Sequence, residues 1–167
     1  QDIPMPPSNR LSRTVHRMDN LPAGLRAWLI SYAFGATVRF VRTAGLRFED
    51  LSEARALVHL PNRRKVQNHI HSAHAAAVAL LGETATGAVF GMSVPDEKIP
   101  LLKSMRINYV KRSRGDLRAE AAISELERRR ILTDEKGDIN VPVKITDETG
   151  EATVECEYVW AWRSRKT

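Results

Sequence analysis

The sequence of 167 residues contains one cysteine, Cys156, so it can form neither an internal disulfide nor a zinc site built from several cysteines. A lone cysteine favours a reducing compartment, and we expect a cytoplasmic protein. No run of 18 apolar residues is present, so no membrane span is expected. The opening stretch QDIPMPPSNR is rich in proline and has no hydrophobic core like that of a signal peptide. We expect residues 1–20 to form a mobile arm.

Acidic residues are fewer than basic ones: the chain has 20 Asp and Glu and 26 Lys and Arg, which gives a formal net charge of +6. This balance suggests an anionic partner, either a nucleic acid or a phosphorylated small molecule, although a basic surface without a ligand would look the same. No aromatic residues are interleaved with the basic ones as in an RNA-binding sheet, so nucleic acid is not the expected partner. The basic residues fall in short clusters: NRRK at 62–65, VKRSR at 110–114, ERRR at 127–130 and RSRK at 163–166.

The spacing of apolar residues predicts the elements that follow the arm. Helical spacing predicts one helix over 21–37 and a second one from Ala73 onward, whose apolar body requires burial on all sides. A short third helix is expected at 124–132, followed by a loop at 133–138. Alternation predicts strands at 37–50, 53–61, 103–113 and 115–123, and a long hairpin over 139–166 with the turn DETG.

Strands that follow one another by turns favour an antiparallel sheet. A curved antiparallel sheet wrapped around the long apolar helix satisfies both this sheet and the helix, so the predicted fold class is α+β. We expect one domain over residues 21–167, which includes the N-terminal helix.

Residues 67–87, QNHIHSAHAAAVALLGETATG, hold the most reactive side chains of the chain. Three interpretations are open: a metal site, a catalytic site, or the start of an ordinary buried helix. His69, His71 and His74 have the H-x-H-x-x-H spacing that some metallohydrolases use. However, no aspartate lies among them, and the chain has few other histidines to complete a coordination sphere. No bound metal is therefore expected.

The start of the second helix offers a different kind of site. Ser72 is the predicted N-cap, and the first turn would present unpaired N–H groups that polarise a carbonyl oxygen. The small side chains of Ala75 and Ala76 would let a substrate approach this backbone. Glu83 lies nine residues beyond His74, on the opposite face and about 13 Å further along the axis. Only an antiparallel helix from a second copy, in a symmetric dimer, could bring a Glu83 to this helix start. From the residues alone, Glu83 could equally be a solvated or capping residue.

Asn68, the run His74-Ala75-Ala76 and Glu83 together resemble the motif of hot-dog-fold acyl-CoA thioesterases of the phenylacetate-pathway type. That motif has an Asn, then His-Gly-Gly six residues on, then Asp or Glu nine residues after the His. The likeness extends over residues 36–163 and is strongest to an uncharacterised domain-of-unknown-function branch of the superfamily. It implies a hot-dog fold, a homodimer or dimer of dimers with sites between subunits, and hydrolysis of an acyl-CoA or acyl-carrier thioester. The only cofactor implied is coenzyme A, as part of the substrate.

The resemblance assigns a role to each matching position. Glu83 would activate water as a general base or attack the thioester itself, and Asn68 would orient the water or the thioester. His74 would support the loop or the carbonyl. The N–H of Ala75, with Ala76 beside it, would polarise the thioester oxygen. Both alanines replace glycines of the motif. Alanine would be strained if either position had a positive φ, and harmless if the position lies inside a helix.

Coenzyme A carries phosphates, and the resemblance places them near the turn after the strand that follows the helix. Arg112 and Arg114 lie in that turn, where an arginine fork suits a phosphate, although a solvated turn would look the same. Other functions remain open. They are binding of an acyl thioester without cleavage, a hydratase or dehydratase on the same fold, and a histidine-rich metallohydrolase.

Overall fold

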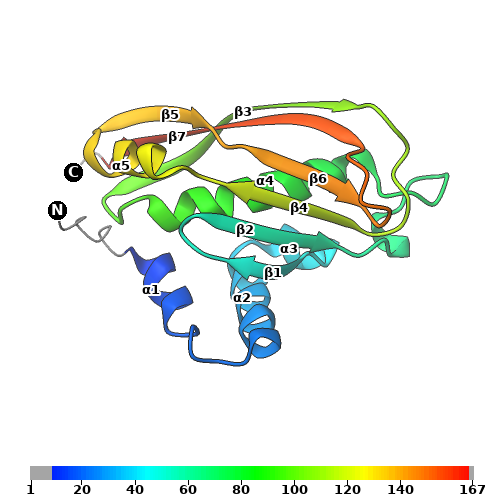
Figure 1. Cartoon of the computed structure of the whole chain (residues 1–167), viewed down its shortest axis with the longest axis horizontal. Helices are drawn as coiled ribbons and strands as arrows, with labels where there is room; N and C mark the ends of the chain where they lie inside the picture. Colours follow the sequence, from blue (N-terminus) through cyan, green and yellow to red (C-terminus); the bar gives the residue numbers. More distant parts are fainter. Residues whose placement is uncertain (1–8, 166–167) are drawn as a thin grey trace.

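The computed structural model describes residues 9–165. At its centre lies a long helix, α4 (Ala75–Ser93), which packs against curved antiparallel sheets, as Figure 1 shows. The other helices are α1 (Arg10–His16), α2 (Ala23–Thr37), α3 (Arg39–Ala44) and α5 (Glu125–Thr133), with a 3-10 turn, η1, at Arg64–Val66. The strands are β1 (Arg47–Leu51), β2 (Arg55–Leu60), β3 (Lys98–Tyr109), β4 (Leu117–Ala122), β5 (Lys136–Asn140), β6 (Val143–Asp147) and β7 (Val154–Ser164). The predicted α+β class is confirmed.

The strands form two antiparallel sheets, in the orders β1-β2-β4-β6 and β3-β7-β5. β5 and β6 are nearly continuous in the chain, which changes sheet at Pro142, a residue without an N–H to donate. Just before it, the Val141 N–H still donates to Tyr158 O of β7 at 3.0 Å. The two sheets therefore join through this segment and wrap around α4, as the sequence predicted.

The predicted hairpin over 139–166 is wrong, because its two strands do not pair with each other along their length. Its turn is present, with Gly150 at a φ of 83°, but β6 pairs with β4 whereas β7 pairs with β3 and β5. The reason is length, because β7 has 11 residues and finds its full-length partner in β3, which has 12. In addition, β5 begins inside the predicted loop 133–138.

Small side chains on the sheet let α4 approach it closely. Along β4, Leu117, Ala119 and Ala121 are buried and alternate with exposed residues, which is the pattern of a strand with one face on a core. By length and hydropathy α4 could cross a membrane, but 67% of the relevant window is buried inside the protein. The helix is therefore the core of the fold.

Residues 9–20 are not the mobile arm that the sequence predicted. They contain α1, whose N-cap Asn9 accepts from the Ser12 N–H at 2.7 Å and is 3% exposed. The Asn9 Nδ2 lies 2.6–3.2 Å from the carbonyl oxygens of Gly91, Met92 and Val94. Helix ends leave such carbonyls without partners, so this one amide fastens α1 to the end of α4. Residues 1–8 of the predicted arm lie outside the described residues.

The strand predicted at 37–50 is correct only over its last four residues, 47–50. Residues 39–44 form α3, which buries Val41 and Ala44 and leaves Phe40 exposed. The three-residue spacing of the buried pair is helical, and it prevails over the short alternation of Val38 and Phe40. Gly45, at a φ of 79°, ends the helix and turns the chain into β1.

His16 on α1 gives a pH-dependent contact with the rest of the fold. Its ring hydrogen-bonds to Asp19 at 2.8 Å and to Glu53, between β1 and β2. These two carboxylates raise the pKa of His16. A raised histidine pKa stabilises the fold below the unfolded value near 6.5, and the effect is lost as the pH rises through the folded pKa.

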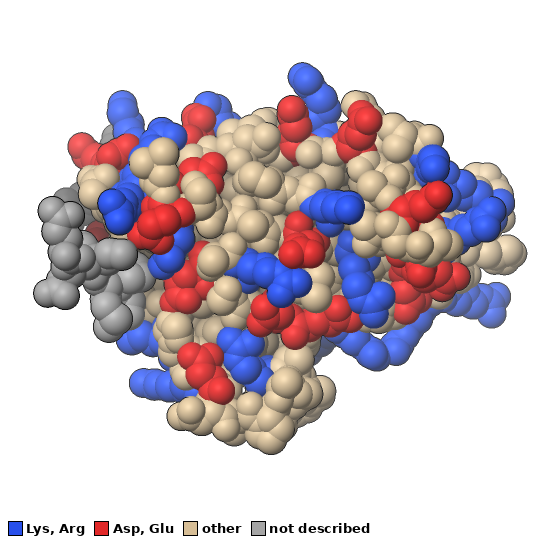
Figure 2. All heavy atoms as spheres, viewed as in Figure 1, with Lys and Arg blue, Asp and Glu red and all other residues tan. Residues whose placement is uncertain are grey.

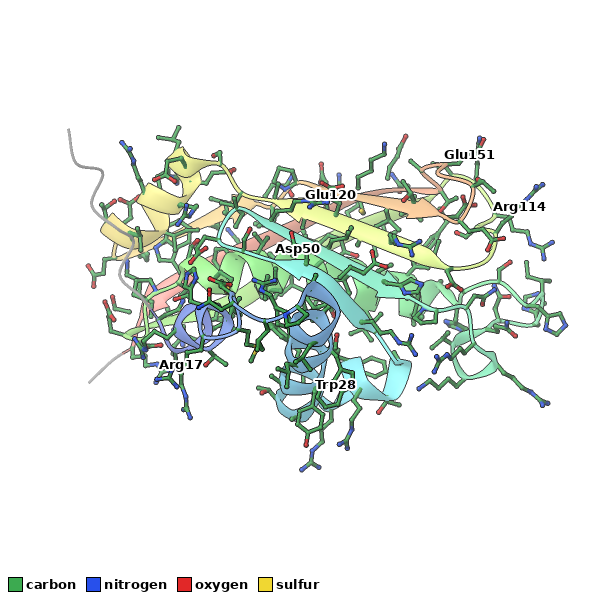
Figure 3. All side chains as sticks on the ribbon, turned by 60° about the horizontal axis from the view of Figure 1, so that its bottom comes forward. Arg17, Trp28, Asp50, Arg114, Glu120 and Glu151 are labelled. Atoms are coloured by element: carbon green, nitrogen blue, oxygen red, sulfur yellow. The ribbon has the colours of Figure 1, made fainter. Side chains whose placement is uncertain are left out.

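We therefore expect His16→Ala to lower the melting temperature by about 2 °C at pH 5.5 and by less at pH 9, because an exposed pair contributes at most about 1 kcal/mol. Thermal unfolding at the two pH values measures this. Arg17→Ala, at the next residue of the chain, which is labelled in Figure 3, serves as the control. Its effect on the melting temperature should show no such pH dependence. An equal loss at both pH values would refute the electrostatic explanation.

Candidate functional site

Asn68 organises the loop that precedes α4. Its Oδ1 accepts from the backbone N–H groups of Ile70 and Ser72, each at 3.1 Å. Its own backbone N–H donates to Ser72 O at 2.9 Å, and its carbonyl accepts from the His71 N–H at 3.1 Å. The chain turns through His71 at a φ of 59°. The oxygen of the Asn68 side chain is thus used by the loop, while its Nδ2 has no acceptor within residues 9–165.

The helix begins slightly later than predicted, because His74, and not Ser72, is the N-cap of α4. The His74 Nδ1 accepts from the Ala76 N–H at 3.0 Å. In a neutral imidazole this places the proton on Nε2, so the solvent-facing part of the exposed ring carries an N–H donor. Ser72 is instead buried beneath the loop.

Both alanines that replace the glycines of the resembled motif lie in the first turn of α4, and neither has a positive φ. Alanine is therefore unstrained here. Their backbone N–H groups differ in whether they have a hydrogen-bond acceptor. The Ala76 N–H is taken by His74, whereas the exposed Ala75 N–H has no acceptor in the part of the chain that the structure describes. One backbone donor is thus open at the positive end of the helix.

Glu83 lies in the middle of α4 and is partly buried. Its carboxylate has no hydrogen-bond or ion-pair partner among the described residues. Burial raises the pKa of this carboxyl, since ionisation inside the protein lacks the hydration available in water. The helical rise separates it from His74 by roughly 13 Å in the same chain. A single chain therefore brings Asn68, His74 and Ala75 together and leaves Glu83 apart from them.

Two tyrosines from the sheet frame this part of α4, and the sequence analysis missed both. Tyr158 of β7 lies against Gly82, where an added Cβ would overlap its phenol group. Burial, with the nearby charge of Glu83 among the lesser causes, raises the pKa of Tyr158 far above its usual value. Tyr109, near the end of β3, donates to Ala75 O at 2.7 Å. Alternation marks both only as strand residues, so no sequence signal separates them from the core.

The two arginines predicted to bind phosphate differ in their contacts. Arg112 holds the loop, because its Nε donates to Ser72 Oγ at 3.0 Å and its Nη2 donates to Ile70 O at 2.8 Å. Arg114 is anchored by its backbone N–H, which donates to Asp147 Oδ2 at 3.0 Å. Figure 3 shows its side chain extending from the turn between β3 and β4 into solvent.

Further cations gather at this end of the molecule, on the right of the view in Figure 2. A hollow of about 470 Å³ lies beside the turn and is lined by His71, Ser72, Arg112, Ser113, Arg114 and Gly115. Other exposed cations are Lys111, which is paired with Glu151 at 3.0 Å, and Arg63, Arg64 and Lys65 at η1. This basic end, defined by these cations with Arg112 and Arg114, adjoins the start of α4.

We expect Arg112→Ala to accelerate backbone hydrogen exchange in residues 68–74 by at least about tenfold, because hydrogen bonds to a charged group are lost. Arg114→Ala is the matched control and should leave this exchange unchanged. Hydrogen exchange followed by mass spectrometry measures both. If the two variants behave alike, Arg112 does not hold the loop.

His69 and His71 are exposed on this loop. Within residues 9–165, no group of three or more His, Cys, Asp or Glu side chains is placed to hold a metal ion.

A long helix wrapped by curved antiparallel sheets, with a polar loop at the helix start, defines a protein of the hot-dog fold. The chain belongs to the DUF4442 family, described as a domain of unknown function, whose model matches residues 26–162. No curated protein sequence matches the chain.

Solved structures share this fold. A protein of unknown function from Pseudomonas aeruginosa, described as a probable thioesterase, is 28% identical with a TM-score of 0.76, over 87% of this chain and 97% of the other. A thioesterase from Haemophilus influenzae is 12% identical with a TM-score of 0.66, over 83% and 90% of the two chains. A thioesterase from Staphylococcus aureus is 18% identical with a TM-score of 0.63, over 75% and 99%. The last two likenesses concern the fold alone.

Proposed function

We propose that this protein is a thioesterase that hydrolyses an acyl-CoA, or an acyl-carrier thioester, to the free acid. The observation that carries the proposal is the Glu83 carboxylate, which is partly buried and without a partner among the described residues, on the same helix that presents the open Ala75 N–H. An ionisable group kept unpaired in this way is costly for the fold, which is typical of functional sites. The description of the similar Pseudomonas aeruginosa structure as a probable thioesterase supports the same reaction.

The reaction requires two copies of the chain. β3 lies at the edge of its sheet and is 12 residues long, with Leu101, Met105 and Tyr109 about half exposed. An edge strand of this length is a template for pairing with another strand. Antiparallel pairing of β3 with β3 of a second copy would set the two α4 helices side by side in opposite directions. Each Glu83 would then approach the helix start of the other copy.

In such a dimer each residue has a separate task. The thioester oxygen would accept from the Ala75 N–H of one copy, aided by the positive end of α4. Glu83 of the other copy would take a proton from water, which attacks the carbonyl carbon and expels the thiolate. The raised pKa makes this carboxylate a stronger base. The Asn68 Nδ2 and the Nε2–H of His74 would orient the water and the thioester.

The basic end supports coenzyme A as the carrier of the acyl group. It adjoins the helix start, and its exposed Arg114 offers a fork for a phosphate. An acidic carrier protein would also be attracted by these cations. Kinetics with acyl-CoAs in the presence of free coenzyme A distinguish the two, because only a CoA-specific site is inhibited by it.

The experiment that tests the proposal is thiol release from a panel of acyl-CoAs, from acetyl to tetradecanoyl, by the purified protein. We expect turnover with at least one of them. Absence of release from every acyl-CoA and acyl-carrier substrate would rule the enzyme out.

One observation favours a second function, the binding of acyl thioesters without cleavage. The Ala76 N–H is occupied by His74, so a single open amide, that of Ala75, is left to stabilise an oxyanion. Loss of one such donor lowers rates by about 10²–10³ in other enzymes. Tight binding of acyl-CoA without thiol release would identify this function.

A further inference from the structure

A cavity of about 670 Å³ lies between α1, α2, the end of α4 and the start of β3. In Figure 1 it corresponds to the region where α1 and α2 extend from one side of α4. Gly91 lines this cavity, whereas no residue of the candidate functional site does. The helical rise puts Gly91 about 24 Å from Ala75 along α4. The cavity is therefore a separate feature, at the other end of the helix from the candidate site.

Separate anchors hold the two helices that border the cavity. Asn9 fastens α1 to carbonyl oxygens at the end of α4. On α2, the Ser31 Oγ accepts from the Phe48 N–H of β1 at 2.8 Å. The Arg26 Nη2 donates to Leu51 O, also on β1, at 2.8 Å. Because each helix is positioned by its own partner, the space between them does not have to close for either helix to be held.

Most of the cavity wall is apolar. Val15 of α1, Ile30 of α2 and Val94 are buried, with 4% of their surface or less exposed. Leu11 and Phe34 are partly buried and add further apolar surface. Cavities of this size and character are typical of small-molecule sites. Each methylene of an alkyl chain that enters such a wall strengthens binding by about fourfold.

Five polar side chains of the wall already have hydrogen-bond partners. Asn9 donates to the end of α4, and the hydroxyl groups of Thr14 and Thr37 donate to carbonyls of their own helices. The Lys98 ammonium uses all three N–H groups on carbonyls around the end of α5, at 2.7–2.9 Å. The two oxygens of Asp96 accept from α1 at 2.9 and 3.1 Å. None of these five has a side-chain donor left for a ligand.

The other two polar residues of the wall, Arg10 and Arg165, differ from these five. Both are exposed, and within residues 9–165 neither guanidinium group has a hydrogen-bond or ion-pair partner. The Arg10 N–H donates to Asp96 Oδ1 at 2.9 Å, and the Arg165 N–H donates to Glu97 O at 2.9 Å. The two arginines therefore lie at the same end of the cavity.

The charge at this end is positive. The charged side chains here are those of Arg10, Arg13, Asp96, Glu97, Lys98 and Arg165, so the cations outnumber the carboxylates. The Asp96 carboxylate is paired with Arg13 at 3.1 Å and does not neutralise the two open guanidinium groups. A guanidinium fork suits a carboxylate or a phosphate. The cavity thus combines an apolar wall with an end that attracts an anion.

We propose that this cavity binds a single-chain amphiphile with an anionic head group, either the carboxylate of a long-chain fatty acid or the phosphate of a phosphorylated lipid. The head group lies at Arg10 and Arg165, and the chain lies between α1 and α2. This site does not depend on the thioesterase function proposed above, because it shares no residue with the candidate site.

Calorimetry with tetradecanoate and with tetradecyl phosphate tests the proposal. Ala33→Phe fills the cavity from α2, and Ala36→Phe is the matched control at an exposed position outside the wall. We expect Ala33→Phe to weaken binding of both probes by about 50-fold, the effect of excluding roughly three methylenes. Ala36→Phe should leave binding unchanged. The probe that binds the unaltered protein more tightly identifies the head group, and failure to bind either one overturns the proposal.

A second pair of variants tests the head-group contacts without changing the apolar wall. The double variant Arg10→Gln and Arg165→Gln should weaken binding of both anionic probes by about tenfold and leave binding of uncharged tetradecanol unchanged. Arg17→Gln with Arg39→Gln removes the same charge at exposed positions outside the cavity and is the control. Equal effects of the two double variants would show that only net charge matters and would overturn the assignment of the head group.

Hydrogen exchange followed by mass spectrometry locates the bound probe. We expect tetradecanoate to slow exchange in residues 10–37, which contain α1 and α2, and to leave residues 68–74 unchanged. Protection confined to residues 68–83 would place the ligand at the candidate site and refute the cavity. A protein that releases no thiol but shows the expected protection retains this inference and loses the proposed reaction. An active thioesterase without that protection retains the reaction and loses the inference.

Discussion

Glu83→Gln is expected to lower kcat/KM for thiol release by about 10²–10⁴-fold, the usual contribution of a general base. The same change should raise the melting temperature at pH 7. Burial raises the pKa of Glu83, so the folded state takes up a proton more readily than the unfolded chain. The ionised carboxylate therefore costs stability above the folded pKa, and this cost falls as the pH drops below that pKa and is absent below the unfolded pKa. Glutamine removes the charge and keeps the shape.

The activity of the unaltered protein should also fall as the pH is lowered through the raised pKa of Glu83, because a protonated base cannot accept the proton of water. The pH profile of kcat/KM and thermal unfolding at pH 7 measure the two effects. Glu135→Gln, at an exposed acidic position away from α4, is the control and should alter neither. Full activity in Glu83→Gln would eliminate this residue as the base and with it the mechanism.

Met105→Glu is expected to convert the proposed dimer into monomers and to abolish the proposed thioester hydrolysis with it. Met105 is 53% exposed near the middle of β3. If two β3 strands pair about a two-fold axis, the substitution brings two carboxylates close together, and like charges across an interface cost several kcal/mol. Light scattering after gel filtration and thiol release, at the same protein concentrations, measure the two outcomes together.

Leu126→Glu provides the control for this substitution. Leu126 is 71% exposed on α5, outside the β3 edge, and the change introduces the same charge. It should preserve both assembly and activity. Monomeric Met105→Glu protein that remains fully active would show that each chain holds a complete site. An unaltered protein that is monomeric at all working concentrations and still releases thiol would have the same consequence.

The loop before α4 shows how far sequence reasoning reaches at the site. The spacing of Asn68, His74 and Glu83 placed two of them at a helix start and the third in its middle, and the structure agrees with this. The sequence could not show that the N-cap of the helix is His74 and not Ser72. Both residue types can accept a hydrogen bond from the first turn, and the outcome depends on how Asn68 folds the loop.

The tyrosines and the arginines show where sequence reasoning fails at the site. Tyr109 and Tyr158 come from strands far along the chain, and only the packing of β3 and β7 against α4 brings them to the helix. Arg112 and Arg114 are equivalent by composition, yet one is tied to the loop and the other is open to solvent. That difference depends on the position of Ile70 and Ser72, which no local pattern specifies.

The sequence by itself determined the long apolar helix, the alternating strands around it and the α+β class, because periodicities of 3.6 and 2 residues record which faces are buried. It did not determine which strands pair, since β6 and β7 flank one turn and still join different sheets. It also predicted a mobile arm where α1 forms, because a helix of seven residues is held by tertiary contacts such as those of Asn9 and not by its own propensity. A cavity of about 670 Å³ between α1, α2 and the end of α4 likewise follows from how these elements pack, which only the tertiary structure shows.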